Sequence, residues 1–249
     1  MIIIKNDDEI ALMKKAGRIV GETLLLLEKE VKPGITTADL DRIAEEFITK
    51  HGAKPSFKGL YGFPSSLCIS VNEQVIHGFP GAYVLKEGDI VSVDCGAFYD
   101  GFHGDAARTF SVGNISVDAQ KLIDITRESF FQGIKFAKEG NKLTDISYGI
   151  QSYVEAAGFS VVRNFVGHGI GRKVHEEPNV PNFGKSGKGP KLVKGMVLAI
   201  EPMVNAGTHK VKTLKDGWTV VTADSSLSAH YENTVAILSD GPEILTLIK

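Results

Sequence analysis

The chain has 249 residues, of which 43% are hydrophobic, and this is enough for one large domain or for two halves that share a core. Its formal net charge is −2 and its lysines and arginines are scattered, so we expect no nucleic-acid-binding groove. Two cysteines are too few for a disulfide framework, and no apolar run is long enough for a signal peptide or a membrane span, so a cytoplasmic location is expected.

Two helices are predicted at the start of the chain. Residues 6–31 carry apolar side chains at alternating spacings of three and four, which places them on one face of a helix, and Asn6 is suited to cap it. Pro33 ends this helix. A second helix follows, capped by Thr36 or Thr37.

A hairpin of two strand-like runs is predicted around Asp100. A turn centred on Tyr99 and Asp100 would place Asp94 opposite Asp105, whereas a turn at Asp100 and Gly101 would place the two diagonally. In both registers the two carboxylates share a face, roughly 5–8 Å apart at Cβ. Two like charges this close are unfavourable without a cation between them, although each residue taken alone reads as an ordinary turn or edge aspartate.

The second half of the chain repeats the plan of the first half at a nearly constant offset. Five positions recur 106 residues later and two recur 107 residues later: Gly34 and Gly140, Asp39 and Asp145, Leu40 and Ile146, Phe47 and Tyr153, Gly52 and Gly158, then Gly88 and Gly195, Asp94 and Glu201. We therefore predict one α+β domain over residues 1–249, made by an internal duplication into about 1–115 and 116–249. Two unrelated α+β stretches are the alternative.

Two glutamates and a histidine join the aspartates as candidates for one site. Glu201 ends the apolar run 196–200 and Glu232 precedes the apolar run 233–238, so each should be paired, protonated or bound to a metal. His168 lies between two glycines, where backbone approaches a site closely, although a lone histidine there is usually only a loop residue. Four carboxylates and one imidazole suit two adjacent divalent ions: Mn²⁺, Fe²⁺ or Co²⁺, with Zn²⁺ also compatible.

Six short strings carry a resemblance to a known family. They are Val93-Asp94-Cys95-Gly96, Gly104-Asp105, Gly167-His168-Gly169-Ile170-Gly171, His175-Glu176-Glu177-Pro178, Ala199-Ile200-Glu201-Pro202 and Glu232-Asn233-Thr234. Through these strings the chain resembles type I methionine aminopeptidase nearly end to end. The resemblance implies a pita-bread fold, in which two pseudo-symmetric halves share antiparallel sheet covered by helices. It also implies removal of N-terminal methionine from peptides and nascent proteins, with a small second residue preferred.

The resemblance implies roles for individual residues. The metal ligands fall on Asp94, Asp105, His168, Glu201 and Glu232. Glu201 is also implied as the general base, while His175 stabilises the substrate oxyanion and His77 contacts the scissile nitrogen. The pocket for the methionine side chain falls on Cys68, Phe63, His77 and Trp218, with Phe57 as a further candidate. The remaining histidines are expected to be surface or structural: His51, His103, His209 and His230.

Some positions depart from the family pattern. Asn233 stands where a histidine is expected, Val174 stands where an aromatic residue is common, and residues 185–190 are rich in glycine and lysine. These departures bear on pocket shape and surface more than on the ligands. The short separation of His175 from Glu201 favours type I over type II, and the early start of the first helix predicts no N-terminal extension. We expect a monomer that acts on protein N-termini, with ribosome association left open.

Three alternatives remain at this point. A prolidase or proline-specific aminopeptidase shares the fold but usually carries a large extra N-terminal domain. A non-catalytic binding protein on the same scaffold would have lost ligands, whereas all five are present here. A carboxylate-metal phosphatase or nuclease has no support from the Gly-His-Gly and Glu-Pro contexts.

Overall fold

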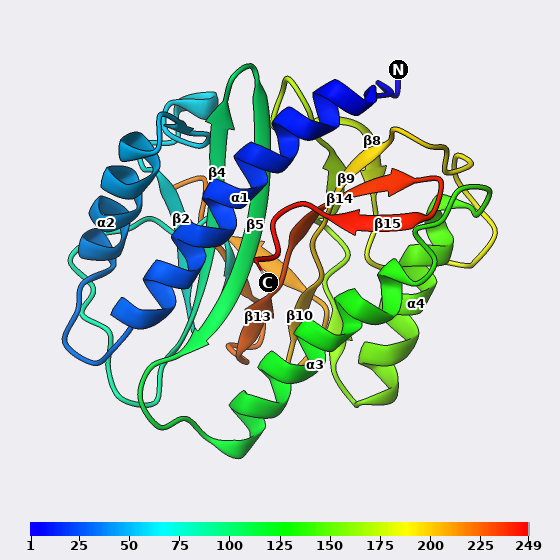
Figure 1. Ribbon diagram of the computed structural model, residues 1–249. Coiled ribbons are helices and arrows are strands. Elements are labelled where there is room, and N and C mark those ends of the chain that lie inside the picture. Colours follow the sequence, from blue (N-terminus) through cyan, green and yellow to red (C-terminus); the bar gives the residue numbers. More distant parts are fainter. Residues whose placement is uncertain (249) are drawn as a thin grey trace.

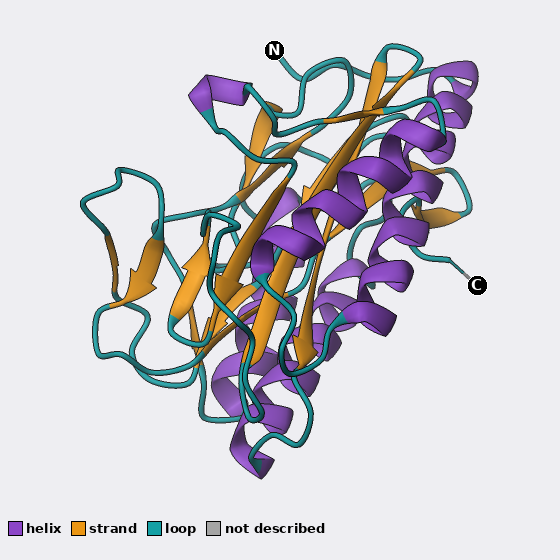
Figure 2. Cartoon of the chain, turned by 90° about the vertical axis from the view of Figure 1, so that its left-hand side faces the viewer, coloured by secondary structure: helices purple, strands orange, loops and turns teal. Residues whose placement is uncertain are grey.

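The computed structural model describes residues 1–248, and in this part of the chain four long helices pack along one side of antiparallel strands (Figures 1 and 2). The helices are α1 (Asp7–Glu30), α2 (Thr37–Lys50), α3 (Val117–Ile134) and α4 (Leu143–Ala156), with a short turn of 3₁₀ helix, η1 (Leu60–Gly62). The strands of the first half are β1 (Lys54–Pro55), β2 (Leu67–Val71), β3 (Gln74–Ile76), β4 (Ile90–Tyr99) and β5 (Phe102–Ser111). Those of the second half are β6 (Ser160–Val161), β7 (Gly167–Gly169), β8 (Glu176–Val180), β9 (Val197–Ile200), β10 (Met203–Asn205), β11 (Val211–Thr213), β12 (Val220–Thr222), β13 (Ser228–His230), β14 (Asn233–Leu238) and β15 (Gly241–Ile244). No helix in the described part is both long and apolar enough to cross a bilayer.

Both helices predicted at the start of the chain are confirmed. The side chain of Asn6 accepts a hydrogen bond from the backbone of Glu9, whose side chain accepts one from the backbone of Asn6, so the first turn of α1 is closed by a reciprocal cap. Thr36 caps α2 in the same way. Leu24 and Leu27 are buried on the face of α1 that packs on the β4–β5 hairpin (Figure 1).

The β4–β5 hairpin adopts the diagonal one of the two predicted registers. Asp94 lies opposite Ala107, and Asp105 lies opposite Gly96. The turn residues Asp100 and Gly101 have φ of 47° and 88°. Two successive positive φ values define the turn that suits the right-handed twist of a two-residue hairpin, and Asp-Gly is one of its preferred sequences. The turn chemistry therefore determines how the two aspartates are offset.

Local hydrogen bonding recurs between the two halves. Helices α2 and α4 each have 14 residues. Ahead of α2, the backbone nitrogen of Gly34 donates to the carbonyl of Leu85 at 2.8 Å, and ahead of α4 that of Gly140 donates to the carbonyl of Leu192 at 2.9 Å. These contacts repeat at the offsets found in the sequence and support the proposed internal duplication.

The two halves are joined where β5 meets the start of β14. The hydroxyl of Thr234 accepts from the backbone nitrogen of Asp105 and donates to its carbonyl, at 3.0 and 2.9 Å. Glu232 and Ala107 exchange backbone hydrogen bonds beside this contact. Near the C-terminus, the hydroxyl of Thr246 accepts from the backbone nitrogen of Thr234 at 3.2 Å. These contacts between the halves bring Asp105 of the first half close to Glu232 of the second half.

Candidate metal centre

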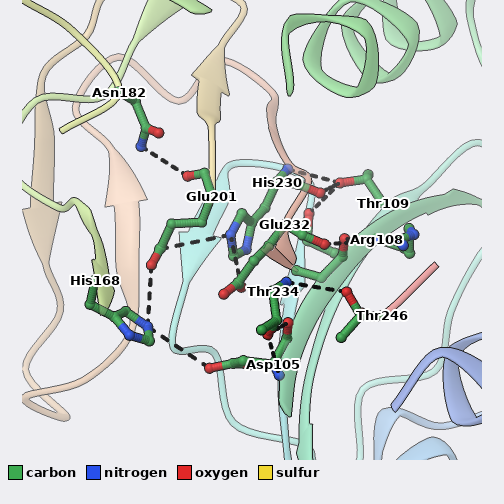
Figure 3. A network of polar contacts seen from close by, with 12 residues as sticks. Asp105, Arg108, Thr109, His168, Asn182, Glu201, His230, Glu232, Thr234 and Thr246 are labelled. Atoms are coloured by element: carbon green, nitrogen blue, oxygen red, sulfur yellow. Dashed lines mark hydrogen bonds and ion pairs between the residues drawn. The ribbon is translucent and has the colours of Figure 1, made fainter. Parts of the chain in front are cut away.

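Four carboxylates from both halves of the chain converge with one imidazole. Asp94 and Asp105 come from β4 and β5, Glu201 follows β9, and Glu232 precedes β14. The Nε2 atom of His168 lies 3.9 Å from Oδ2 of Asp105 and 3.6 Å from Oε1 of Glu201 (Figure 3). Ligand atoms of Asp105, His168 and Glu232 all lie within 4.8 Å of one another. The structure thus brings together the five residues that the resemblance implies as ligands.

Close backbone packing directs His168 toward this cluster. A side chain at Gly167 would collide with the carbonyl of Ala199, and one at Gly169 would collide with that of Glu177, so β7 fits between its neighbours only with glycine on both sides of His168. The Nδ1 atom of His168 lies 2.8 Å from the carbonyl of Gly169. When Nδ1 is held in this way, Nε2 is left free to face the carboxylates.

The electrostatics of the cluster suit bound cations. Burial raises the pKa of Asp94 to about 7. Burial and the neighbouring carboxylates raise the pKa values of Asp105, Glu201 and Glu232 well above their usual range. Among the described residues, several buried side-chain atoms lack a hydrogen-bond partner, including Oδ1 of Asp94, Oδ1 of Asp105 and Oε1 of Glu232. Oxygen atoms of this kind, clustered and unpaired, fit divalent ions, which would balance their charge and complete their bonding.

His230 belongs to the same cluster, which sequence reasoning missed. We expected a surface or structural role, but its side chain is 2% exposed and its Nε2 lies 3.9 Å from Oε2 of Glu201 and 3.7 Å from Oε2 of Glu232. One signal was present in the sequence: His230 stands two residues before Glu232, a spacing that puts two side chains on one side of an extended chain.

A cavity of about 840 Å³ opens over the cluster. It is lined by every residue predicted for the substrate pocket, namely Phe57, Phe63, Cys68, His77, His175 and Trp218. The rings of Phe63 and Trp218 meet edge to face at 5.2 Å. Tyr61, which sequence reasoning did not single out, stacks on His175 at 5.9 Å between ring centroids. A second cavity, of about 420 Å³ between α1 and α3, contains none of the predicted site residues.

His77 and His175 are neutral hydrogen-bonding groups near pH 7. Burial lowers the pKa of His77 to about 4, and partial burial also lowers the pKa of His175, which stands at the exposed mouth of the cavity. His77 has φ of 59°, a left-handed conformation that costs roughly 1–3 kcal/mol for a residue other than glycine. Strain of this size concentrates at functional sites. The ring of His175 lies 4.6 Å from that of His168, so the former faces the cluster from the cavity side.

A buried ion pair secures the segment that carries His175. Nζ of Lys5 lies 2.7 Å from Oε2 of Glu176, and the two side chains are only 2% and 3% exposed. The other carboxylate oxygen of Glu176 accepts from the backbone nitrogen of Lys173 at 3.2 Å. Because both charges are removed from water, loss of either partner would leave the other charge buried and unpaired. Lys5 thereby links the N-terminal residues to the wall of the cavity.

Comparisons with known proteins agree with this geometry. The model of metallopeptidase family M24 matches residues 11–239. The chain is 76% identical to methionine aminopeptidase of Clostridium perfringens over the whole of both chains. The crystal structure of methionine aminopeptidase from Thermotoga maritima superposes with a TM-score of 0.98, at 48% identity and with 100% of both chains covered. Prolidase from Pyrococcus furiosus has a TM-score of 0.80 at 23% identity, covers 99% of this chain and 66% of its own, and shares the fold alone.

The fold prediction is confirmed by these superpositions, since α+β halves with antiparallel strands are common to the chain and its structural relatives. High identity over the full length separates the methionine aminopeptidases from the prolidases, which were an alternative from sequence. The chain therefore belongs to metallopeptidase family M24 and, within it, to the methionine aminopeptidases.

Proposed function

We propose that the protein is a metal-dependent aminopeptidase that hydrolyses the first peptide bond of chains that begin with methionine. One observation carries the proposal: the carboxylate and imidazole cluster forms the floor of a cavity whose walls are aromatic and sulfur-bearing. The floor suits hydrolysis by divalent ions, and the walls suit a thioether, which packs well on aromatic edges and on sulfur. Cys68, Phe63 and Trp218 supply those walls.

The proposed metal site holds two divalent ions on Asp94, Asp105, His168, Glu201 and Glu232. Its oxygen-rich donor set favours Mn²⁺, Fe²⁺ or Co²⁺ and remains compatible with Zn²⁺. When bound, such ions supply Lewis acidity that activates water at neutral pH and polarises the substrate carbonyl.

The chain's own residues divide the remaining chemistry. Glu201 accepts the proton of the attacking water, a role that its position among the other carboxylates allows. His175 donates a hydrogen bond to the carbonyl oxygen as negative charge develops there. His77, which also lines the cavity, contacts the scissile nitrogen. Both imidazoles are neutral near pH 7, so each carries one ring N–H with which it can donate a hydrogen bond to the substrate.

The cellular setting is also part of the proposal. Both cysteines are free and buried, which suits a reducing cytoplasm. We propose a cytoplasmic monomer with a single catalytic domain whose substrates are the N-termini of peptides and nascent proteins, preferably with a small second residue. Association with ribosomes would bring the enzyme to those substrates.

Peptide cleavage by metal-free protein supplied with one ion at a time tests the function. With Mn²⁺, Fe²⁺ or Co²⁺, we expect Met-Ala-Ser to be cut at least ~10-fold more efficiently than Met-Leu-Ser, because the cleft is expected to narrow at the second residue. Chelated protein serves as the blank. Preference for a peptide that begins with proline would favour a proline-specific enzyme, and cleavage of no peptide with any ion would favour a binding protein.

The fluorescence of Trp218 tests the placement of the methionine pocket. It is the only tryptophan in the chain, and its ring lies 5.2 Å from Phe63 and 6.3 Å from His77. Binding of free methionine should displace water from the indole and change its emission, whereas glycine at equal concentration should not. If methionine at a concentration that inhibits cleavage leaves the emission unchanged, Trp218 does not contact the substrate side chain.

A further inference from the structure

Glu201 stands between two imidazoles rather than beside one. Its Oε1 lies 3.6 Å from Nε2 of His168, and its Oε2 lies 3.9 Å from Nε2 of His230. Figure 3 shows a dashed line from the carboxylate of Glu201 to each of the two rings. Each imidazole also has a second carboxylate nearby. Nε2 of His168 lies 3.9 Å from Oδ2 of Asp105, and Nε2 of His230 lies 3.7 Å from Oε2 of Glu232.

These separations are too long for hydrogen bonds. An N–H···O bond joins atoms about 2.7–3.2 Å apart, and among residues 1–248 the buried Nε2 of His230 has no hydrogen-bond partner. The separations do suit two atoms bound to one ion. Ligand atoms lie about 2.0–2.2 Å from such an ion and therefore roughly 3–4 Å from each other. The distances from Nε2 of His230 to the nearby carboxylates match those from Nε2 of His168, so both rings are positioned to bind a metal. Ligand atoms of Asp94, His230 and Glu232 lie within 4.8 Å of one another.

The backbone that carries His230 is rigidly held. The hydroxyl of Thr109 accepts from the nitrogen of His230 and donates to its carbonyl, both at 2.9 Å. Beside it, the guanidinium of Arg108 donates to the carbonyl of Glu232 at 2.6 Å and lies 4.3 Å from the ring of Tyr231. Residues 230–232 are thus clamped from β5, which fixes the imidazole and the neighbouring carboxylate together. A ligand pair needs this kind of support.

We infer that His230 is a metal ligand, so that each of the two ions is held by its own imidazole. His168 would contribute beside Asp105 and Glu201, and His230 beside Asp94 and Glu232. This inference rests on the two-ion centre proposed above and extends its donor set. His230 approaches the cluster from the side away from the substrate cavity, which it does not line, so ligation there leaves the substrate side open.

A second imidazole would also alter metal preference. Nitrogen donors favour Fe²⁺, Co²⁺ and Zn²⁺ over Mn²⁺ and Mg²⁺ more strongly than carboxylates do. The loss of an outer partner of a ligand typically costs about 10–100-fold in metal affinity, and the loss of a ligand should cost at least as much. His230→Gln should therefore weaken the binding of one of two Co²⁺ ions by at least ~10-fold, and that of Mn²⁺ by a smaller factor.

Proton NMR of Co²⁺-loaded protein counts the coordinated rings directly. Protons of an imidazole bound to paramagnetic Co²⁺ are shifted far outside the normal range. Wild-type protein with two Co²⁺ ions should show the shifted proton signals of two imidazole rings. The signals of one ring should be absent in His168→Gln, and those of the other should be absent in His230→Gln. His175→Gln should keep both, and His51→Gln, an exposed histidine on the surface, serves as the matched control. Calorimetric titration of each variant with Co²⁺ and Mn²⁺ accompanies the spectra.

The possible outcomes distinguish the proposed two-ion centre from the further proposal that His230 is one of its ligands. Two Co²⁺ ions bound with one shifted ring, absent only in His168→Gln, would refute ligation by His230 and leave the metal centre standing. Wild-type protein that binds no Co²⁺ would refute the metal centre itself, and ligation by His230 with it. If His230→Gln does not fold, the spectra of wild type and of the His168 and His175 variants still decide: a second shifted ring that survives both changes supports His230, and its absence refutes it.

Discussion

Glu201→Gln should lower kcat by at least ~10²-fold while the protein remains folded. The amide cannot accept the proton of the attacking water, and it removes one negative charge from the metal site. The change is nearly isosteric, and the contact that Asn182 makes at 2.9 Å is to the backbone carbonyl of Glu201, so it survives. One of the two metal ions should also bind more weakly to this variant than to the wild-type protein.

Steady-state cleavage of Met-Ala-Ser at saturating metal measures this effect, and circular dichroism checks the fold. Glu46→Gln provides a control of the same chemistry, since Glu46 is exposed on α2 and forms an ion pair with Arg42, away from the site. A kcat near that of wild type in the Glu201 variant would show that another group accepts the proton.

His175→Ala should reduce kcat by roughly 10²–10³-fold, the usual worth of one oxyanion donor. Its hydrogen bond strengthens as charge grows on the carbonyl oxygen, so KM should change much less. Metal stoichiometry and affinity should stay normal, because the ring lines the substrate cavity and is not among the proposed ligands. His168→Ala should instead lose affinity for one ion, and added metal should partly restore its activity.

Calorimetric metal titration beside peptide kinetics decides between the two histidines. Their rings lie 4.6 Å apart, so either variant could in principle disturb the site, and the kinetic and metal readouts must be compared in the same preparations. Loss of an ion from the His175 variant alone would mean that the two roles are exchanged.

The local parts of this structure follow from the sequence. The caps of α1 and α2 are predictable because they depend on residues three apart. The shared face of Asp94 and Asp105 is predictable because the strand period is two. The register between them was left open. It depends on the positive φ values of Asp100 and Gly101, which Asp-Gly favours but which the alternation of side chains along a strand does not specify.

The convergence of distant residues could not be predicted from local patterns. His168 meets Glu201 because β7 pairs with β9, and Glu232 meets Asp105 across the seam between the halves. Reasoning from the residues singled out these positions as candidates for one site, and the family resemblance assigned them as a single set of ligands. His230 was missed although it stands two residues before Glu232, because that spacing places the two side chains on one side only if the chain is extended there.

The hydrogen bonds of Thr246 to residues 233 and 234 have a consequence for biosynthesis. Its hydroxyl holds the backbone of Thr234 and donates to the side chain of Asn233 at 2.9 Å, directly beside Glu232. Translation proceeds from the N-terminus at roughly 5–20 residues per second, so the last structural support of the centre is made many seconds after Asp94. The first methionine of each new copy therefore leaves the ribosome long before that copy can act on anything. Processing of freshly made chains therefore rests on molecules completed earlier.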